Sequence, residues 1–352
     1  MNSRRSFMKA GVLGASAVGL SKNIFAAHHE LVRPMLDGQP VRTVDIHAHC
    51  VFPEVSSVIN GTSLAGVNFN PSQVVGARRI EQMNELGLEY QALSVNNYWW
   101  YGADRSLSAD IVRLHDEGIA AWCNEHPNRF VGLSSVALQH PDLAAEQLEY
   151  AVNELGLRGA SVGGHVEGVE PTSEFYDPFW AKAEELNVPV FMHPGGADNV
   201  IVPDSLDGRG ELGNIIGNPL ETTIFLTKMI FDGVFDRFPG LRVLGAHGGG
   251  YLPSYLGRAE VACQVRGNAN CLNTKTPSEY LKTQIFADSM VFSDEGIRHL
   301  VAEMGASQVV YGTDLPFNWP DTMQIILEAD YLTSEEKRAI LGGNLSRLLG
   351  IA

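Results

Sequence analysis

The sequence has little of several features that would indicate particular classes of protein. Its 352 residues include four cysteines, none in a Cys-x-x-Cys pair, so neither a zinc knuckle nor a thioredoxin-like motif is indicated. Positive charge is also scarce, because 25 Lys and Arg stand against 41 Asp and Glu, for a formal net charge of −16. Such a balance repels phosphate backbones, so we expect no nucleic-acid partner. No dinucleotide-binding fingerprint, internal repeat or low-complexity block is present.

The four cysteines are Cys50, Cys123, Cys263 and Cys271. Cys263 and Cys271 are close enough in sequence to pair in an oxidising compartment, but we expect free thiols. Cys50 follows a His-x-His motif, and we interpret it as a small packing residue rather than a nucleophile.

The N-terminus has the layout of an export signal. Arg4 and Arg5 lie in the run Ser-Arg-Arg-Ser-Phe-Met-Lys, and an apolar stretch rich in Gly and Ala follows at 10–20. This pattern resembles a twin-arginine signal peptide, with cleavage near Ala26 or Ala27. The apolar stretch is shorter than the roughly 20 residues that a permanent membrane span needs. We expect a signal peptide at 1–27, a spacer at 28–40, the twin-arginine machinery as a partner, and a periplasmic location. The alternative is a cytoplasmic enzyme with a basic N-terminus by chance.

What remains, 41–352, has ordinary globular composition, with 45% hydrophobic and 19% charged residues. Short β-rich runs alternate with helical patterns, which favours one (β/α)₈ barrel, although an open doubly wound sheet would alternate in the same way. A Gly/Asn/Asp-rich segment at 195–218 is interpreted as a lid. The predicted strands are 42–49, 89–95, 129–137, 157–162, 188–193, 241–247, 283–288 and 308–314, and the clearest helices are 77–86, 107–125, 143–155, 175–186 and 220–235.

Polar residues are concentrated at the ends of these strands. His47 and His49 end the first strand two residues apart and so project to the same side, while His193, His247 and Asp314 end later strands. In a (β/α)₈ barrel all C-terminal strand ends meet at one face. Each motif alone has an ordinary explanation as a packed or exposed residue. Together they would bury several titratable groups, which a divalent cation would compensate.

These motifs carry a family resemblance. The segments His-Ala-His at 47–49, Met-His-Pro at 192–194, Ala-His-Gly-Gly-Gly at 246–250 and Gly-Thr-Asp-Leu-Pro at 312–316 resemble the amidohydrolase superfamily. The similarity is greatest to its branch of 2-amino-3-carboxymuconate-6-semialdehyde decarboxylase and related nonoxidative decarboxylases, and it runs from about residue 41 to 352. Further matching segments are 79–83, 257–258, 277–280, 288–289 and 343–344.

The resemblance implies one metal ion per chain, bound by His47, His49, His193 and Asp314. Binuclear relatives use a carboxylated lysine after the fourth strand, whereas residues 161–165 here contain no lysine. The expected metal is Zn²⁺, and Mn²⁺, Co²⁺ or Fe²⁺ also suit nitrogen and oxygen ligands without thiolate.

The resemblance also implies the roles of other residues. His247, with Asp314, is the expected catalytic group, using a metal-bound water and a histidine acid/base; the alternative for His247 is an extra ligand. Arg258 matches an arginine that reaches the substrate carboxylate of a neighbouring subunit, which implies a homodimer. The loop at 51–76 lacks an arginine that the related decarboxylases carry. Other expected substrate-binding residues are Arg266, His165 and Asp288; for Arg258 and Arg266 the alternative is an exposed arginine in a solvated ion pair. Independently of the resemblance, Trp99 is expected to form an aromatic wall for a ring substrate, and packing explains it equally well.

The sequence thus predicts a metal-dependent carbon–carbon lyase that removes CO₂ from a small aromatic or unsaturated carboxylate. A metal-dependent hydrolase of an amide, lactone or ester on the same barrel is the alternative, because activated water serves both reactions. A binding protein without catalytic activity is a third and more remote possibility.

Overall fold

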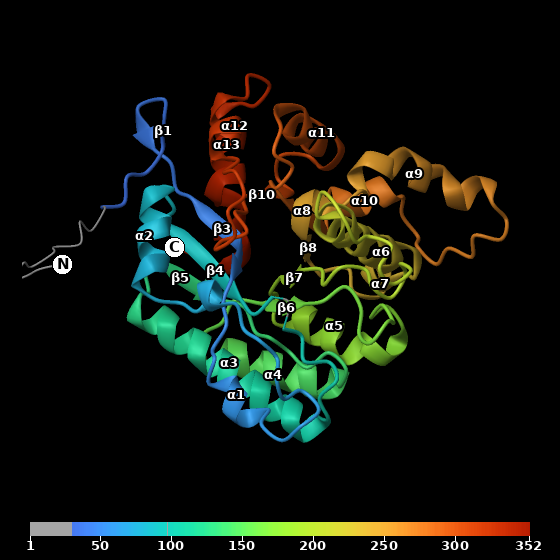
Figure 1. Cartoon of the computed structure of the whole chain (residues 1–352). Coiled ribbons are helices and arrows are strands. Elements are labelled where there is room, and N and C mark those ends of the chain that lie inside the picture. The colour runs from blue at the N-terminus through green and yellow to red at the C-terminus, as the bar shows by residue number, and fades with distance from the viewer. Residues whose placement is uncertain (1–29, 97) are drawn as a thin grey trace, which may run out of the picture.

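The computed structural model describes residues 30–96 and 98–352, so the predicted signal peptide lies outside the described residues. Eight short strands alternate with helices along the chain, and each lies within a predicted range (Figure 1). They are β3 (Val44–His49), β4 (Tyr90–Ser94), β5 (Phe130–Gly132), β6 (Ala160–Val162), β7 (Val190–Met192), β8 (Val243–Gly245), β9 (Ile285–Asp288) and β10 (Val309–Val310).

The eight strands form a closed ring. All neighbours pair in parallel, in the orders β3-β4-β5 and β6-β7-β8-β9-β10. A parallel bridge between Ser134 and Ala160 joins β5 to β6, and another between Ala48 and Leu315 joins β3 to the segment after β10. The His49 N–H donates to the carbonyl of Leu315 at 2.8 Å across the second junction. The predicted (β/α)₈ barrel is therefore confirmed, and its closure brings the first and last strand ends together.

The helices form the outer layer around this ring (Figure 1). The longer ones are α2 (Ala77–Glu85), α3 (Arg105–Glu125), α4 (Pro141–Asn153), α5 (Asp177–Glu185), α6 (Asn218–Phe231), α9 (Leu256–Val265) and α11 (Asp294–Met304). The shorter ones are α1 (Val55–Val58), α7 (Val234–Arg237), α8 (Ala246–Gly249), α10 (Pro277–Leu281), α12 (Met323–Glu328), α13 (Ser334–Arg338) and α14 (Asn344–Leu349). In the described residues, no helix has the length and apolar character that crossing a membrane requires.

The buried side chains of the strands form two main hydrophobic clusters. A large cluster of buried side chains lies between strands and helices, and includes Trp180, Phe225 and Tyr311. A smaller cluster joins β3, β7 and β8 and includes Phe191; residues of α14 contribute to it. Buried strands with apolar residues on both sides are typical of parallel sheets covered by helices, so polar strand ends stand out against this background.

Two local features differ from the sequence-based expectation. The range 220–235, predicted as one helix, is divided into α6 and α7 because Gly233 adopts a left-handed conformation with φ 70°. Within the predicted spacer, β1 (Met35–Leu36) and β2 (Gln39–Pro40) form an antiparallel hairpin. Arg338 donates to the carbonyls of Leu36 and Pro40 and so ties this hairpin to the C-terminal helices.

A projecting segment at 256–276, called the arm below, contains α9 and the chain that returns from it (Figure 1). Cys263 and Cys271 form a disulfide across the arm, with Cα atoms 6.0 Å apart. The expectation of free thiols at these two positions is therefore wrong, because the returning chain brings Cys271 back beside α9. Cys50 is a free and fully buried thiol, as expected of a packing residue.

Candidate active site and metal centre

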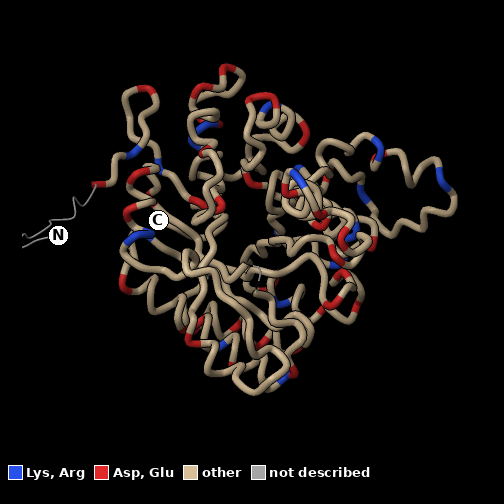
Figure 2. The backbone as a smooth tube through the Cα atoms, viewed as in Figure 1, with Lys and Arg blue, Asp and Glu red and all other residues tan. Residues whose placement is uncertain are grey.

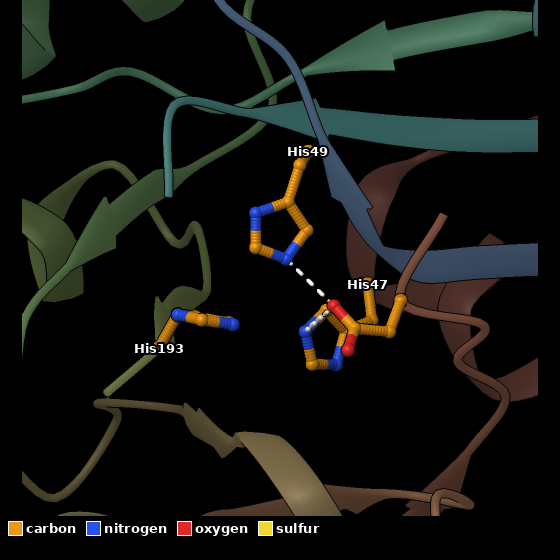
Figure 3. Close-up of side chains that lie close together, drawn as sticks. His47, His49 and His193 are labelled. Atoms are coloured by element: carbon orange, nitrogen blue, oxygen red, sulfur yellow. Dashed lines mark hydrogen bonds and ion pairs between the residues drawn. The ribbon is translucent and has the colours of Figure 1, made fainter. Parts of the chain in front are cut away.

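Four residues from three distant parts of the chain converge at the C-terminal face of the barrel. His47 and His49 come from β3, His193 follows β7 and Asp314 follows β10. One potential ligand atom from each lies within 4.8 Å of those of the other three, and all four residues are buried. Figure 3 shows the three imidazoles facing a common point. The structure thus brings together the complete set of predicted metal ligands.

The rings of the His-x-His pair are oriented by other side chains. Nδ1 of His47 lies 2.7 Å from a carboxylate oxygen of Asp288, and Nδ1 of His49 lies 3.2 Å from the side-chain amide of Gln73. In both rings Nε2 therefore faces the cluster, 3.1 Å and 2.7 Å from Asp314 Oδ1. A histidine that binds metal through one nitrogen usually has the other nitrogen held in this manner.

The electrostatics of the cluster favour one additional positive charge. Burial would lower the pKa of His47, but the carboxylates of Asp314 and Asp288 outweigh it and raise that pKa to about 10. Burial lowers the pKa of His49, and burial with the neighbouring rings lowers that of His193 well below its usual value. Burial would raise the pKa of Asp314, yet His47 and His49 hold it far below its ordinary range. The carboxylates that raise the pKa of His47 would likewise favour the positive charge of a divalent cation at this position.

The buried nitrogen atoms also fit a cation. Nε2 of His47 is shielded from solvent, and its 3.1 Å contact with Asp314 Oδ1 lacks the geometry of a hydrogen bond. Such a nitrogen costs free energy unless it is satisfied, and a metal ion would satisfy it. The donor set of three imidazoles and one carboxylate, with no thiolate, suits Zn²⁺, Mn²⁺, Fe²⁺ and Co²⁺. The residues present therefore fit the expected divalent metal.

His247 lies beside the four candidate ligands but is not one of them. Its ring centroid is 5.1 Å from that of His47 and 5.5 Å from that of His193. Its backbone is left-handed, with φ 55° and ψ 51°, and Asp288 stabilises this turn by accepting the N–H groups of His247 and Gly248 at 3.1 and 2.8 Å. Backbone strain of this kind persists where the surroundings enforce it, often at functional sites. Burial lowers the pKa of His247 to about 4, so the imidazole is neutral at pH 7.

A cavity of about 510 Å³ opens above this group. His49, His193, His247 and Asp314 line its inner end. The other lining residues are Glu211, Asn214 and Asn218 from the end of the predicted lid, and Phe317, Asn318 and Trp319 after β10. The lining residues include no lysine or arginine, so within one chain the site offers a substrate aromatic faces, amides and one exposed carboxylate.

The five residues expected to bind substrate do not line this cavity. Asp288 is fully buried, and both of its oxygens are already used by His47 and by backbone N–H groups, which makes it a partner of the ligands. Trp99 packs against Gly163, where an added Cβ would lie 2.9 Å from its ring. His165 Nε2 lies 3.0 Å from Asp198, in the loop that follows β7.

The two arginines, Arg258 and Arg266, are exposed on the arm. Neither arginine lines the cavity of its own chain, and the expected contact of Arg258 with the substrate of a neighbouring subunit stays a prediction.

Several residues that support the site were not predicted to have a role in it. Asp45 lies behind the ligands, where it accepts the His47 N–H at 2.8 Å and the Thr313 hydroxyl at 2.6 Å, and so joins β3 to the segment that carries Asp314. Burial raises the pKa of Asp45 to about 6. Arg79 donates to the carbonyl of His49 at 2.8 Å. Its only signal in the sequence is its place in one of the family segments, whereas nothing in the sequence alone marks Gln73.

Comparison with known proteins agrees with this geometry. A family model described as "Amidohydrolase" matches residues 44–351. The 2-amino-3-carboxymuconate-6-semialdehyde decarboxylase of Dictyostelium discoideum is 32% identical over 277 residues, covering 78% of this chain and 76% of that protein. The gamma-resorcylate decarboxylase of Rhodococcus jostii (strain RHA1) is 30% identical over 280 residues, covering 72% and 83%.

A solved structure shares the fold. The dihydroxybenzoic acid decarboxylase of Polaromonas sp. JS666, solved with bound manganese and the inhibitor 2-nitroresorcinol, superposes with a TM-score of 0.77. The match covers 88% of this chain and 97% of that one at 23% sequence identity. At this level of identity the similarity supports the barrel architecture.

Proposed function

Because this chain belongs to the amidohydrolase family, we propose that it is a divalent-metal-dependent decarboxylase that removes CO₂ nonoxidatively from an aromatic or unsaturated carboxylate. The strongest support is the imidazole of His247, placed beside the ligand cluster at the inner end of a cavity with aromatic walls. The two relatives described above, each at least 30% identical, are named as decarboxylases.

The reaction requires breaking one carbon–carbon bond and adding one proton to the carbon that CO₂ leaves. A divalent cation held by His47, His49, His193 and Asp314 would bind substrate oxygens and stabilise negative charge that develops on the substrate. The nearby imidazole of His247 is suited to proton transfer, because it lines the cavity beside the ligand cluster and its Nδ1 makes no hydrogen bond within the described residues. His247 would carry the proton from solvent to the substrate carbon.

The cavity walls position a flat substrate. The ring of Phe317 meets His49 edge-on with centroids 4.9 Å apart, and Trp319 stacks on Phe292 at 5.3 Å. These contacts fix the orientations of Phe317 and Trp319, and aromatic walls with a few polar groups are typical of small-molecule sites. A planar unsaturated carboxylate therefore suits this cavity.

We propose Zn²⁺ as the metal, with Mn²⁺ as the alternative because manganese is bound in the dihydroxybenzoic acid decarboxylase structure. The test is to load the purified protein with each metal and incubate it with matched panels of aromatic carboxylates, lactones and amides. We expect CO₂ release from carboxylates and no hydrolysis products, and His247→Ala as the control should release almost no CO₂. Hydrolysis without CO₂ release would favour a metal-dependent hydrolase instead.

We further propose that two copies of the chain associate through the arm. Tyr255, just before α9, is 67% exposed, and Val265 and Leu272 within the arm are 68% and 67% exposed. The arm carries Arg258, Arg266 and Lys275 against a single acidic residue, whereas the chain as a whole is strongly acidic (Figure 2). Apolar side chains and a charge opposite to that of the body would suit contact with a second copy. In such a dimer Arg258 would reach the partner's cavity, whose described lining residues include no lysine or arginine.

A periplasmic location is proposed on two grounds. One is the twin-arginine pattern at the N-terminus, and the other is the disulfide between Cys263 and Cys271. Disulfides persist in oxidising compartments and are rare in the cytosol. The arm is exposed, so its disulfide would otherwise be accessible to cytosolic reductants.

A further inference from the structure

The first turn of α6 contains a buried carboxylate, Glu221, which no sequence motif identifies. The residue is only 4% exposed, although it lies close to the loop that follows His193. A carboxylate removed from water needs compensating hydrogen bonds or charge. The compensation at Glu221 comes from the backbone of two loops at the barrel mouth.

Four backbone N–H groups donate to this carboxylate. Gly164, in the loop after β6, donates to Oε1 at 2.9 Å. Three successive groups in the loop after β7, those of Gly195, Gly196 and Ala197, donate to Oε2 at 2.8, 2.6 and 2.9 Å. Consecutive N–H groups that converge in this way form an anion-binding concavity of the backbone. Glu221 is therefore an anion supplied by the chain itself.

The sequence around Glu221 is adapted to this close approach. A Cβ added at Gly164 would lie 2.6 Å from Cγ of Glu221, so only glycine fits there. Gly196 has φ 132° and Ala197 has φ 60°, and the latter is an unusual conformation for a residue with a side chain. Ala197 is also fully buried. The hydrogen bonds to Glu221 stabilise a backbone path that the chain would otherwise disfavour.

The loop that Glu221 holds begins at a metal ligand. On the strand side, the N–H of His193 donates to the carbonyl of Val162 at 2.9 Å and fixes the residue to β6. On the loop side, Pro194 has no N–H to donate, and the next three N–H groups all bind Glu221. The backbone is thus held immediately before and immediately after the side chain that faces the cluster.

We propose that Glu221 is a positioning residue for His193: its carboxylate fixes the loop after β7 so that the imidazole stays aimed at the other ligands. This proposal rests on the proposed function only in taking the cluster to bind a divalent ion, and it does not depend on the substrate or the reaction. Glu221 itself does not line the cavity and is not a ligand.

The test is the affinity of the protein for Zn²⁺ and Mn²⁺ in the absence of substrate. Glu221→Gln replaces one acceptor oxygen with an NH₂ group that faces backbone donors, so the loop should lose part of its support. We expect Kd for the metal to rise about 10- to 100-fold, the range typical for partners of metal ligands. Amide hydrogen exchange at 195–197 should accelerate in the same variant.

Asp116→Asn is the matched control. Asp116 is also a buried carboxylate on a helix, and it accepts the N–H of Ser135 at 2.9 Å and the hydroxyl of Ser134 at 2.5 Å, outside the metal cluster. A purely structural role for Glu221 predicts similar effects in both variants. We expect Asp116→Asn to leave the metal Kd within about twofold of the original protein.

Two results would overturn the proposal: an unchanged metal Kd in folded Glu221→Gln, or an equal loss of affinity in the Asp116→Asn control. If Glu221→Gln does not fold, Glu221→Asp keeps the charge on a shorter side chain and should give a smaller rise in Kd. Amide hydrogen exchange in the unsubstituted protein tests independently whether Glu221 holds the loop. Amides 195–197 that exchange as fast as those of the exposed segment 203–210 would show that the carboxylate does not hold them.

Discussion

At the scale of single residues, ligation and catalysis can be separated by two substitutions. His193 has its imidazole within the converging set, and it is the candidate ligand that directly follows β7. His193→Ala should reduce metal content from about one ion per chain to a small fraction, and activity should fall with it. Elemental analysis of the purified variant measures this directly. Full metal occupancy in His193→Ala, or two ions per chain in the original protein, would contradict the assignment.

His247 should behave in the opposite way. Four other residues already form the ligand set, and Asp288 holds the turn at His247 through backbone N–H groups that remain in an alanine variant. His247→Ala should therefore retain its metal and lose turnover by about 10²-fold or more, as expected when a proton-transfer group is removed. Metal content and kcat are measured on the same preparation. Loss of metal would instead make His247 a ligand.

Asp116 makes the stability of the protein depend on pH. Burial raises its pKa to about 7, against the opposing hydrogen bonds from Ser134 and Ser135. The folded state therefore binds this proton more tightly than the unfolded chain does, so the contribution of Asp116 to stability is greatest at acidic pH. It should decline as pH rises from about 4 to about 7, by up to about 4 kcal/mol. Urea unfolding of the original protein and of Asp116→Asn, whose amide does not titrate, should show this difference. Parallel pH profiles would contradict it.

At the scale of elements, the sequence predicts the barrel architecture better than the residues at which its strands end. All eight strands lie where hydrophobic runs place them, but the predicted range 308–314 yields only Val309–Val310 as strand. The chain leaves the strand geometry after β10, and Asp314 adopts a left-handed conformation with φ 60° at the cluster. Functional strand ends depart from regular geometry because they aim side chains at the site, and periodicity carries no information about this.

The metal ligands could be predicted because each is a recognisable residue type at a strand end. Glu221 and Gln73 could not, because their roles depend on contacts between segments that are far apart in sequence. The substrate-binding role expected of Asp288 stays a prediction, because a strand-end carboxylate also suits the support of a histidine ligand, and here its Oδ2 lies 2.7 Å from Nδ1 of His47.

The arm gives an element-scale prediction about Arg258. This side chain is exposed on α9, so only a second chain would bring it to a cavity. Arg258→Ala should reduce kcat/KM about 30- to 1,000-fold without loss of metal, as expected for one charge-assisted contact with a carboxylate. Arg113→Ala, which removes an exposed arginine of α3, is the matched control and should have little effect.

Mixing the weakened Arg258→Ala protein with the inactive His193→Ala protein then tests whether the two chains share a site. In a mixed dimer, one site has an intact His193 from its own chain and an intact Arg258 from the partner chain. Some activity should therefore return. A monomer in solution, or no recovery after mixing under conditions that allow subunits to exchange, would exclude the role of Arg258 across the interface.

At the scale of the whole molecule, the proposed N-terminal signal, the metal cluster and the disulfide are consistent with one route of maturation. A buried ligand set is completed only when β3 and β10 close the barrel, so metal binding and folding are coupled. Twin-arginine export carries folded proteins, which allows the metal to be bound before export. The arm is exposed, so its cysteines remain accessible for oxidation afterwards.

Export can be tested with the full-length chain expressed in a bacterium that has the twin-arginine pathway. The original protein should be found in the periplasmic fraction, and replacing Arg4 and Arg5 with lysine should retain it in the cytoplasm, because the pathway recognises the arginine pair. Thiol labelling under denaturing conditions adds a second measurement. The exported protein should expose two free thiols, Cys50 and Cys123, whereas the retained variant should expose four because Cys263 and Cys271 stay reduced. Equal export of the double variant would refute the proposed location, and four free thiols in the exported protein would refute the disulfide.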